Sequence, residues 1–258
     1  MWKQVVIITG GTGGLGKELA KIYLRQGYQV ILTGRDSMKL KRIQIDWNRH
    51  ESLAVYQLDL AENEAVRAFA AWVKVKYGRC DILYNNAGSA IFKPFLEHDL
   101  TEIHQTIESN LLGTLYMSRA FLPMMMEQRE ARLVNIASLA GRVATSKTAV
   151  YAATKAAVIR FSEALRHEVS HTSVSVTCAL PGPIDTMFLD YADNTGMYRQ
   201  KVKQYLLSPE KTAKIISKAV EKKRFEVALP KRLHLMSLLY PLLPAFFLKR
   251  IAPLLNRK

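Results

Sequence analysis

The 258-residue sequence predicts an α/β fold, a doubly wound parallel sheet in a single domain, from three observations. Short apolar runs alternate with stretches of helical periodicity, as expected when helices cover both faces of a parallel sheet. A glycine cluster directly follows the first apolar run. Hydrophobic residues make up 49% of the chain, which is enough to bury the core of one domain of this size.

The first apolar run, residues 5–9, predicts a buried strand, and Gly10-Gly11-Thr12-Gly13-Gly14-Leu15-Gly16 follows it. A helical pattern then continues to Gly27, which suits a left-handed cap. Glycines between a strand and a helix let a pyrophosphate approach the N–H groups of the helix N-terminus. We therefore predict a Rossmann-like dinucleotide site, with a merely flexible loop as the alternative. Its predicted contacts are Gly10, Thr12, Gly14, Leu15 and Gly16.

The second predicted strand, residues 29–33, ends at Gly34-Arg35-Asp36, where a dinucleotide-binding unit contacts the adenosine ribose. An acid at this point accepts a hydrogen bond from the 2′-hydroxyl of NAD, whereas an arginine pairs with the 2′-phosphate of NADP. Arg35 comes first, so we predict NADP(H), with Asp36 as a helix N-cap or a solvated acid. The alternative for Arg35 is a surface arginine of a basic protein.

Two further strands are predicted to bring polar residues to the same edge of the sheet. Residues 52–60 form the first, with Asp59 near its end, and residues 62–77 form a helix closed by Gly78. Asp59 either contacts the adenine edge or caps this helix. Residues 81–84 form the second strand and run into Asn85-Asn86-Ala87-Gly88. Ligands of open α/β sheets bind at the carboxyl ends of strands, so Asn86, Ala87 and Gly88 are predicted to line the crevice, with turn formation as the alternative.

Tyr151 and Lys155 are four residues apart in a predicted helix and therefore lie on one face of it. A neighbouring ammonium favours the charged form of a phenol, so we expect Lys155 to lower the pKa of Tyr151 towards neutrality. Tyr151 would then serve as a proton donor or acceptor. Such pairs also occur on ordinary solvated helices. A functional role for this pair is therefore predicted only because the upstream motifs accompany it.

These motifs together resemble those of the classical branch of the short-chain dehydrogenase/reductase family, over roughly residues 5–229. The matching motifs are Thr9-Gly10-x-x-x-Gly14-Leu15-Gly16, Asn85-Asn86-Ala87-Gly88 and Tyr151-x-x-x-Lys155, in the family's order and spacing. The resemblance implies a single Rossmann-like domain in which NADPH reduces a ketone to an alcohol, or the reverse. One departure is Thr154, where the family more often has serine.

The resemblance also implies roles for individual residues. Tyr151 would protonate the carbonyl oxygen, Ser138 would hydrogen-bond that oxygen, and Lys155 would lower the pKa of the tyrosine and contact the nicotinamide ribose. Asn110 would hold a water that connects Lys155 to solvent. Pro181, Gly182 and Thr186 would bracket the nicotinamide carboxamide. Residues 187–207 stand where the family places a mobile substrate lid, and their apolar composition favours a lipophilic substrate; a packed helical excursion is the alternative.

The C-terminal part departs from the family core, so we divide the chain into a domain of residues 1–230 and a tail of residues 231–258. The tail is basic, contains no acid, and has an apolar stretch at residues 233–248 that Pro241 and Pro244 interrupt. As a helix this stretch would span roughly 24 Å, short of the ~30 Å hydrocarbon core. It suits an anionic membrane interface, with packing over the substrate cleft or a partner subunit as the alternatives.

The net charge of +15 fits a phosphorylated cofactor, an anionic membrane or an acidic carrier protein, and no nucleic-acid motif is present. The rival activity is reduction of a 3-oxoacyl group on a carrier protein. A non-catalytic NADP-sensing protein is the alternative of another class, which the intact Ser138, Tyr151 and Lys155 disfavour. The family resemblance suggests a homodimer or homotetramer, and we expect a cytoplasmic protein that is peripheral to the membrane if the tail binds lipid.

Two other features suggest chemistry that we do not expect here. His167-Glu168-Val169-Ser170-His171 fits the helical zinc motif of metallohydrolases, but the sequence offers no evident third ligand, so no metal is predicted. Cys80 and Cys178 lie in apolar runs and are predicted to be free thiols.

Overall fold

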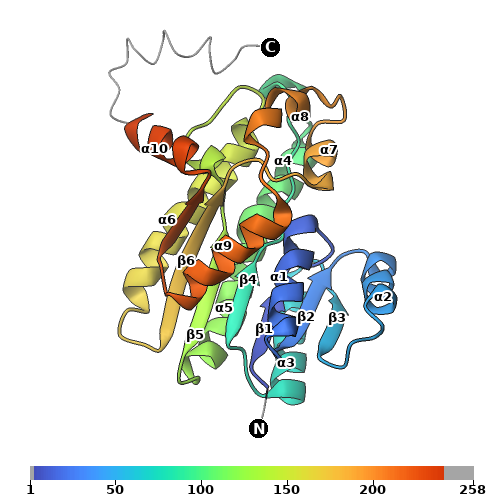
Figure 1. The fold of residues 1–258 in the computed structure, drawn as a ribbon. Helices are drawn as coiled ribbons and strands as arrows, with labels where there is room; N and C mark the ends of the chain where they lie inside the picture. Colours follow the sequence, from blue (N-terminus) through green and yellow to red (C-terminus); the bar gives the residue numbers. More distant parts are fainter. Residues whose placement is uncertain (1–2, 241–258) are drawn as a thin grey trace.

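A seven-stranded parallel sheet forms the centre of the molecule, in the order β3-β2-β1-β4-β5-β6-β7. The computed structural model describes residues 3–240 (Figure 1). The strands are β1 (Val5–Ile8), β2 (Gln29–Gly34), β3 (Leu53–Gln57), β4 (Ile82–Asn85), β5 (Ala131–Ile136), β6 (Val174–Pro181) and β7 (Glu226–Leu229). The strand order reverses between β1 and β4, which creates the crevice where ligands bind in such sheets.

Helices cover both faces of this sheet, as the alternating pattern of the sequence predicts (Figure 1). One face carries α1 (Gly14–Arg25), α2 (Ser37–Asp46) and α9 (Pro209–Glu221), whose apolar residues share a core with β1 and β2. The other carries α3 (Asn63–Tyr77), α5 (Gly113–Met126) and α6 (Ala149–Glu168). The predicted doubly wound α/β fold in a single domain is therefore confirmed.

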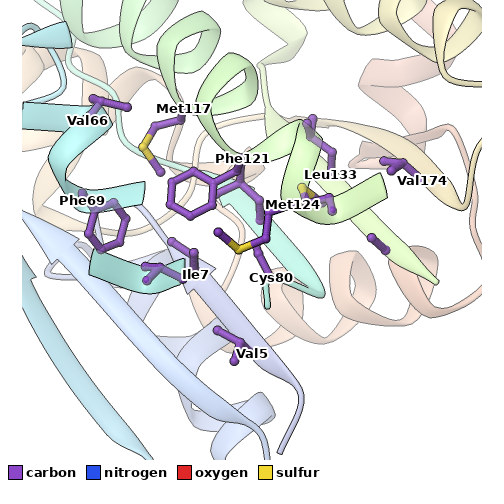
Figure 2. Close-up of a cluster of buried hydrophobic side chains, with 14 of the residues drawn as sticks. Val5, Ile7, Val66, Phe69, Cys80, Met117, Phe121, Met124, Leu133 and Val174 are labelled. Atoms are coloured by element: carbon purple, nitrogen blue, oxygen red, sulfur yellow. The ribbon is translucent and has the colours of Figure 1, made fainter. Parts of the chain in front are cut away.

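The core on the α3 and α5 side is the aromatic and aliphatic cluster of Figure 2. Phe69 of α3 and Phe121 of α5 pack with their ring centroids 5.4 Å apart, and Ile7 of β1 belongs to the same cluster. Cys80 is buried among these side chains as a free thiol, and burial raises its pKa. The loss of solvent therefore keeps this thiol protonated and unreactive.

The shorter elements are α4 (Leu100–Ile107), the 3-10 turns η1 (Phe95–Glu97), η3 (Leu139–Gly141) and η4 (Lys203–Tyr205), the π-helical turn η2 (Glu108–Leu112), α7 (Met187–Ala192), α8 (Met197–Lys201) and α10 (Lys231–Leu239). The helices α7, α8 and α10 lie beyond the carboxyl ends of the strands, at the end of the molecule opposite the N-terminus (Figure 1). They follow β6 and β7 in the chain and enclose the end of the sheet where the crevice opens.

Most predicted helix ends agree with the structure. Gly27 and Gly78 have φ of 82° and 67°, and the Asp36 side chain caps α2 by accepting a hydrogen bond from the N–H of Lys39 at 3.0 Å. Ser208 caps α9 in the same way. Strand β3 is shorter than predicted because the chain turns at Asp59, whose Oδ1 accepts from the N–H of Ala61 at 3.0 Å. Of the two predicted roles for Asp59, the helix cap is not formed, because the N-cap of α3 is Glu62. The contact with the adenine edge stays a prediction.

The predicted tail begins with α10, which packs on β7 and η3. Leu233 contacts the cluster that contains Leu139 and Cys178. The remainder of the apolar stretch, with Pro241 and Pro244, lies outside the described residues. No helix within residues 3–240 is long and apolar enough to cross a membrane.

Candidate active site

A large cavity of about 1180 Å³ opens at the carboxyl ends of the strands. It extends from the glycine turn after β1 to the helices α7 and α10. All the predicted cofactor-binding residues line it, together with Ser138, Tyr151 and Lys155. Asn110 is the one predicted site residue that lies behind the cavity wall. The fold thus brings together residues that are spread over most of the sequence.

The glycine turn is fixed by hydrogen bonds between the ends of β1 and β4. The Thr9 hydroxyl accepts from the N–H groups of Asn86 and Ala87, at 2.9 and 3.0 Å. The Asn86 side-chain amide donates to the carbonyl oxygens of Thr9 and Gly10. Gly10 has φ of 62°, and a Cβ there would come 2.8 Å from Cα of Ala87. Asn86 therefore lines the cavity while its amide holds the turn, and Thr9, to which the sequence analysis assigned no role, is its main partner.

The first turn of α1 faces the cavity without a side-chain cap. Gly14, Leu15 and Gly16 begin this helix, and their backbone N–H groups stand at the positive end of the helix dipole. Lys17, a residue that was not predicted, also lines the cavity here. An uncapped helix start beside a lysine fits the pyrophosphate of a dinucleotide.

The neighbouring end of the cavity is electropositive. Arg35 and Lys39 both line it and both are exposed. Asp36 is engaged as the cap of α2, and this backbone hydrogen bond lowers its pKa. Asp59 is engaged in its own turn. Arg35 is therefore the predicted residue best suited to a phosphate, and Lys39 is a second cation that the sequence analysis missed.

Tyr151 and Lys155 lie one turn apart at the start of α6, and both are buried. The Lys155 ammonium donates to the carbonyl oxygen of Ile136 at 2.8 Å, and its nitrogen is 5.8 Å from the centroid of the Tyr151 ring. Ser138, directly after β5, accepts from the N–H of Ala140 at 3.1 Å and lies on the same wall of the cavity. The three polar groups thus converge on one side of the cavity.

Burial dominates the electrostatics of this pair. Loss of solvent raises the pKa of Tyr151 to about 12, although its hydrogen bond with Ser138 acts in the opposite direction. Loss of solvent lowers the pKa of Lys155 to about 8. The expectation that Lys155 brings the pKa of Tyr151 towards neutrality is therefore wrong for this arrangement. The reason is that both side chains are withdrawn from water, which disfavours the charged form of each.

Asn110 is fully buried in the π-helical turn η2, and both polar atoms of its side chain have hydrogen-bond partners. Its Oδ1 accepts from the N–H of Ser89 at 2.7 Å, and its amide donates to the Ser89 carbonyl and to the Thr154 hydroxyl. Thr154 in turn donates to the carbonyl oxygen of Tyr151 at 2.8 Å. Asn110 therefore connects the loop after β4 to the helix of Tyr151. Thr154 makes these bonds through a hydroxyl that serine would also offer, so the departure at this position leaves the network intact.

Aromatic side chains surround Tyr151 on the side away from the glycine turn. The ring centroids of Phe92 and Phe188 lie 5.7 and 6.0 Å from that of Tyr151, and the Tyr198 ring packs on Phe92 in a tilted arrangement with centroids 4.6 Å apart. Phe188 and Tyr198 come from the predicted lid, which forms the packed helices α7 and α8. Phe92 was missed by the sequence analysis because it follows β4 in a loop with no periodic pattern.

Arg199 of α8 holds the segment of α7 and α8 to the cofactor side of the cavity. Its guanidinium donates to both carboxylate oxygens of Asp190 at 2.8 and 3.0 Å, to Asp185, and to the carbonyl oxygen of Thr186 at 2.8 Å. Thr186 in turn packs on Gly14, where an added Cβ would come 2.4 Å from the Thr186 methyl. One arginine therefore links α8, α7 and the glycine turn.

The H-E-x-x-H sequence does not form the helical metal motif. Helix α6 ends at Glu168, so His167 and His171 do not share a helical face. Within residues 3–240, no group of three or more His, Cys, Asp or Glu residues is arranged to hold a metal ion.

Comparison with known proteins is consistent with this geometry. The short chain dehydrogenase family model matches residues 4–195. An uncharacterized oxidoreductase of Staphylococcus saprophyticus is 35% identical over 185 residues, which are 71% of this chain and 79% of that protein. The crystal structure of a short-chain dehydrogenase from Streptomyces avermitilis is 30% identical and has a TM-score of 0.80, covering 93% of this chain and 94% of that one. The closed form of a serine dehydrogenase complexed with NADP+ is 30% identical and has a TM-score of 0.79, covering 88% and 93%.

The lowered pKa of Lys155 predicts a specific pH dependence of stability. Between pH 8 and pH 10 the unfolded chain retains a proton on this amine that the folded chain has released. The free energy of unfolding, relative to that of Lys155→Met, should therefore rise with pH by up to about 1.4 kcal/mol per pH unit in this window. Urea titrations without nucleotide measure it, with the exposed Lys74→Met as the control. If the free energies of unfolding of Lys155→Met and the unmodified protein changed in parallel with pH, the lowered pKa of Lys155 would be contradicted.

The Arg199 contacts predict that this residue orders α7 and α8. Arg199→Ala removes charge-assisted hydrogen bonds to two carboxylates and a carbonyl, so amide exchange within residues 187–207 should accelerate by about tenfold. Hydrogen exchange read by mass spectrometry measures this change. Arg160→Ala, which removes an exposed pair with Glu163 on α6, is the matched control and should leave the segment unaffected. Unchanged exchange in Arg199→Ala would mean that apolar packing alone holds the helices.

Proposed function

Because this chain belongs to the short-chain dehydrogenase family of oxidoreductases, we propose that it interconverts a ketone and an alcohol with NADP(H), acting on a lipophilic substrate. The observation that carries the proposal is the convergence of Ser138, Tyr151 and Lys155 on one wall of a cavity whose other end is the glycine turn. Residues suited to a dinucleotide and residues suited to proton transfer thus face the same space.

The cofactor would be held by the turn from Gly10 to Gly16, by Asn86, Ala87 and Gly88, and by Pro181, Gly182 and Thr186. When bound, NADPH supplies the hydride. The fit rests on the uncapped start of α1 and on the cations Arg35 and Lys39 at the adenosine end. Because Asp36 is already engaged as a helix cap, the ribose end offers a guanidinium more readily than a free carboxylate, which favours NADP over NAD.

Tyr151 is the proposed proton donor to the carbonyl oxygen, with Ser138 hydrogen-bonded to that same oxygen. With a pKa of about 12, the phenol is protonated at neutral pH and is available as an acid. The Lys155 ammonium, 5.8 Å from the ring centroid, would stabilise the phenolate that forms as the proton leaves. This attraction acts inside a buried site, where it is stronger than in water. Asn110 and Thr154 would keep Tyr151 in position through the backbone of α6.

The substrate side of the cavity supports an apolar substrate. Phe92, Phe188 and Tyr198 surround Tyr151, and Leu233 and Met236 of α10 extend the apolar lining. Burying a hydrocarbon chain against such a wall is favourable, and the wall offers few hydrogen-bond partners to a polar substrate. We propose residues 1–230 as the catalytic domain, with residues 231–258 as an appendage whose first helix closes this side of the cavity.

Oxidation of NADPH with a panel of ketones tests the activity. We expect turnover that increases with apolar chain length, and a loss of about a thousandfold in kcat in Tyr151→Phe with NADPH binding retained. Nicotinamide fluorescence measures the binding independently of turnover. A strict requirement for carrier-linked 3-oxoacyl compounds would favour the carrier-protein reductase instead. Binding without turnover of any ketone would favour a cofactor sensor, and full activity of Tyr151→Phe would refute the assigned acid.

Replacement of Arg35 tests the cofactor preference. Arg35→Ala removes the cation proposed to pair with the 2′-phosphate, so the Kd for NADPH should rise by about tenfold or more while the Kd for NADH changes little. The matched control is Arg42→Ala, an exposed arginine of α2 that does not line the cavity. An equal loss for both nucleotides would contradict the preference for NADP.

A further inference from the structure

Helix α10 exposes large apolar side chains to solvent to an extent that is unusual for a surface helix. Its inward side includes Ser237, which is only 3% exposed, and Leu233. Its outward side carries Leu235 and Leu238, which are 60% and 47% exposed, together with Met236 and Leu239. A surface helix normally turns its apolar stripe inward and its polar residues to water. Here, four large apolar side chains on nine residues face outward.

Exposed apolar side chains continue from α10 across the mouth of the cavity. Met187 and Tyr191 of α7 and Tyr205 of η4 are exposed, and all three line the same cavity as Met236 and Leu239. Met197 of α8 is also exposed and belongs to the same segment of the chain, residues 187–207. We call these residues the apolar rim, which comprises Met187, Tyr191, Met197, Tyr205, Leu235, Met236, Leu238 and Leu239. Scattered exposed apolar residues are ordinary, but a set grouped around one opening indicates a contact surface.

The charges next to the rim are positive. Lys231 and Arg232 stand exposed at the start of α10, and Lys203 is exposed in η4. Three nearby acids are paired, because Asp185 and Asp190 bind Arg199 and Glu226 binds Arg142. A fourth, Asp193, accepts hydrogen bonds from Thr195 and from the N–H of Tyr198. Basic residues adjoining exposed leucine, methionine and tyrosine side chains match the surface of an anionic bilayer, where cations meet the headgroups and apolar side chains enter the interface.

We propose that the apolar rim docks on an anionic lipid surface, so that the mouth of the substrate cavity opens directly into the lipid. The surface used is the folded rim of α7, α8, η4 and α10. The inference rests on the proposed function only for what the cavity takes up, namely a lipophilic ketone or alcohol. The cationic border favours lipid over a second copy of this chain, because a copy would bring the same positive charge to the interface.

Vesicle flotation of the full-length protein tests the docking. We expect binding to vesicles of phosphatidylcholine with phosphatidylserine, and weaker binding to vesicles of phosphatidylcholine alone. The variant Leu235→Glu/Leu238→Glu should bind the anionic vesicles at least about tenfold more weakly, since it places two carboxylates on the apolar face. The matched control is Ile45→Glu/Val75→Glu. These residues lie on α2 and α3 and are 58% and 90% exposed. This variant should bind the vesicles as the unmodified protein does.

Further readouts separate this proposal from a folding defect and from failure of the proposed activity. Leu235 and Leu238 do not line the cavity, so the double variant should keep the unfolding temperature and the NADPH affinity of the unmodified protein. Flotation itself requires no turnover. Three results would overturn the proposal: no binding of the unmodified protein to anionic vesicles, equal binding of the double variant, or a rim variant that converts an oligomer to a monomer.

Discussion

The contact between the ends of β1 and β4 is the constraint on which the rest of the site depends. The Thr9 hydroxyl accepts hydrogen bonds from two backbone N–H groups in the loop after β4. The side-chain amide of Asn86 donates two hydrogen bonds to backbone carbonyl oxygens just after β1. These bonds fix the glycine turn and the Asn86-Ala87-Gly88 wall relative to one another. The crevice between them is a topological consequence of the reversed strand order, and its shape is set by a few buried polar atoms.

Burial decides the electrostatic character of the cavity wall at Tyr151 and Lys155 more than any pairwise attraction does. Tyr151 and Lys155 shift in opposite directions for the same reason, because each loses the water that would stabilise its charged form. The wall therefore holds a neutral phenol next to an amine that gives up its proton more easily than an exposed lysine. Any charge that develops there interacts strongly with neighbouring charges and dipoles, since little solvent remains to screen it.

The sequence was sufficient for the features that depend on local pattern. The glycine turn, the helix caps at Gly27, Gly78 and Ser208, and the alternation of strands and helices follow from residues close together in the chain. Contacts between segments far apart in the chain could not be predicted from the sequence. The partners of Thr9 are 77 and 78 residues away, and the direction of the Tyr151 shift depends on the burial that many elements create together. The position of the tail that begins with α10 could only be left as a choice between membrane, cleft and partner subunit, because composition does not determine which side of a helix is buried.

The position of Thr186 between Gly14 and Arg199 joins two parts of the cavity wall. Its methyl group packs on Gly14 at the start of α1, and its carbonyl oxygen accepts a hydrogen bond from the Arg199 guanidinium of α8. Thermodynamic reciprocity then requires that a ligand which binds the start of α1 more tightly when α7 and α8 hold this position stabilises that position by the same factor. The first turn of α1 and the segment of α7 and α8 are therefore expected to respond together to whatever occupies the cavity.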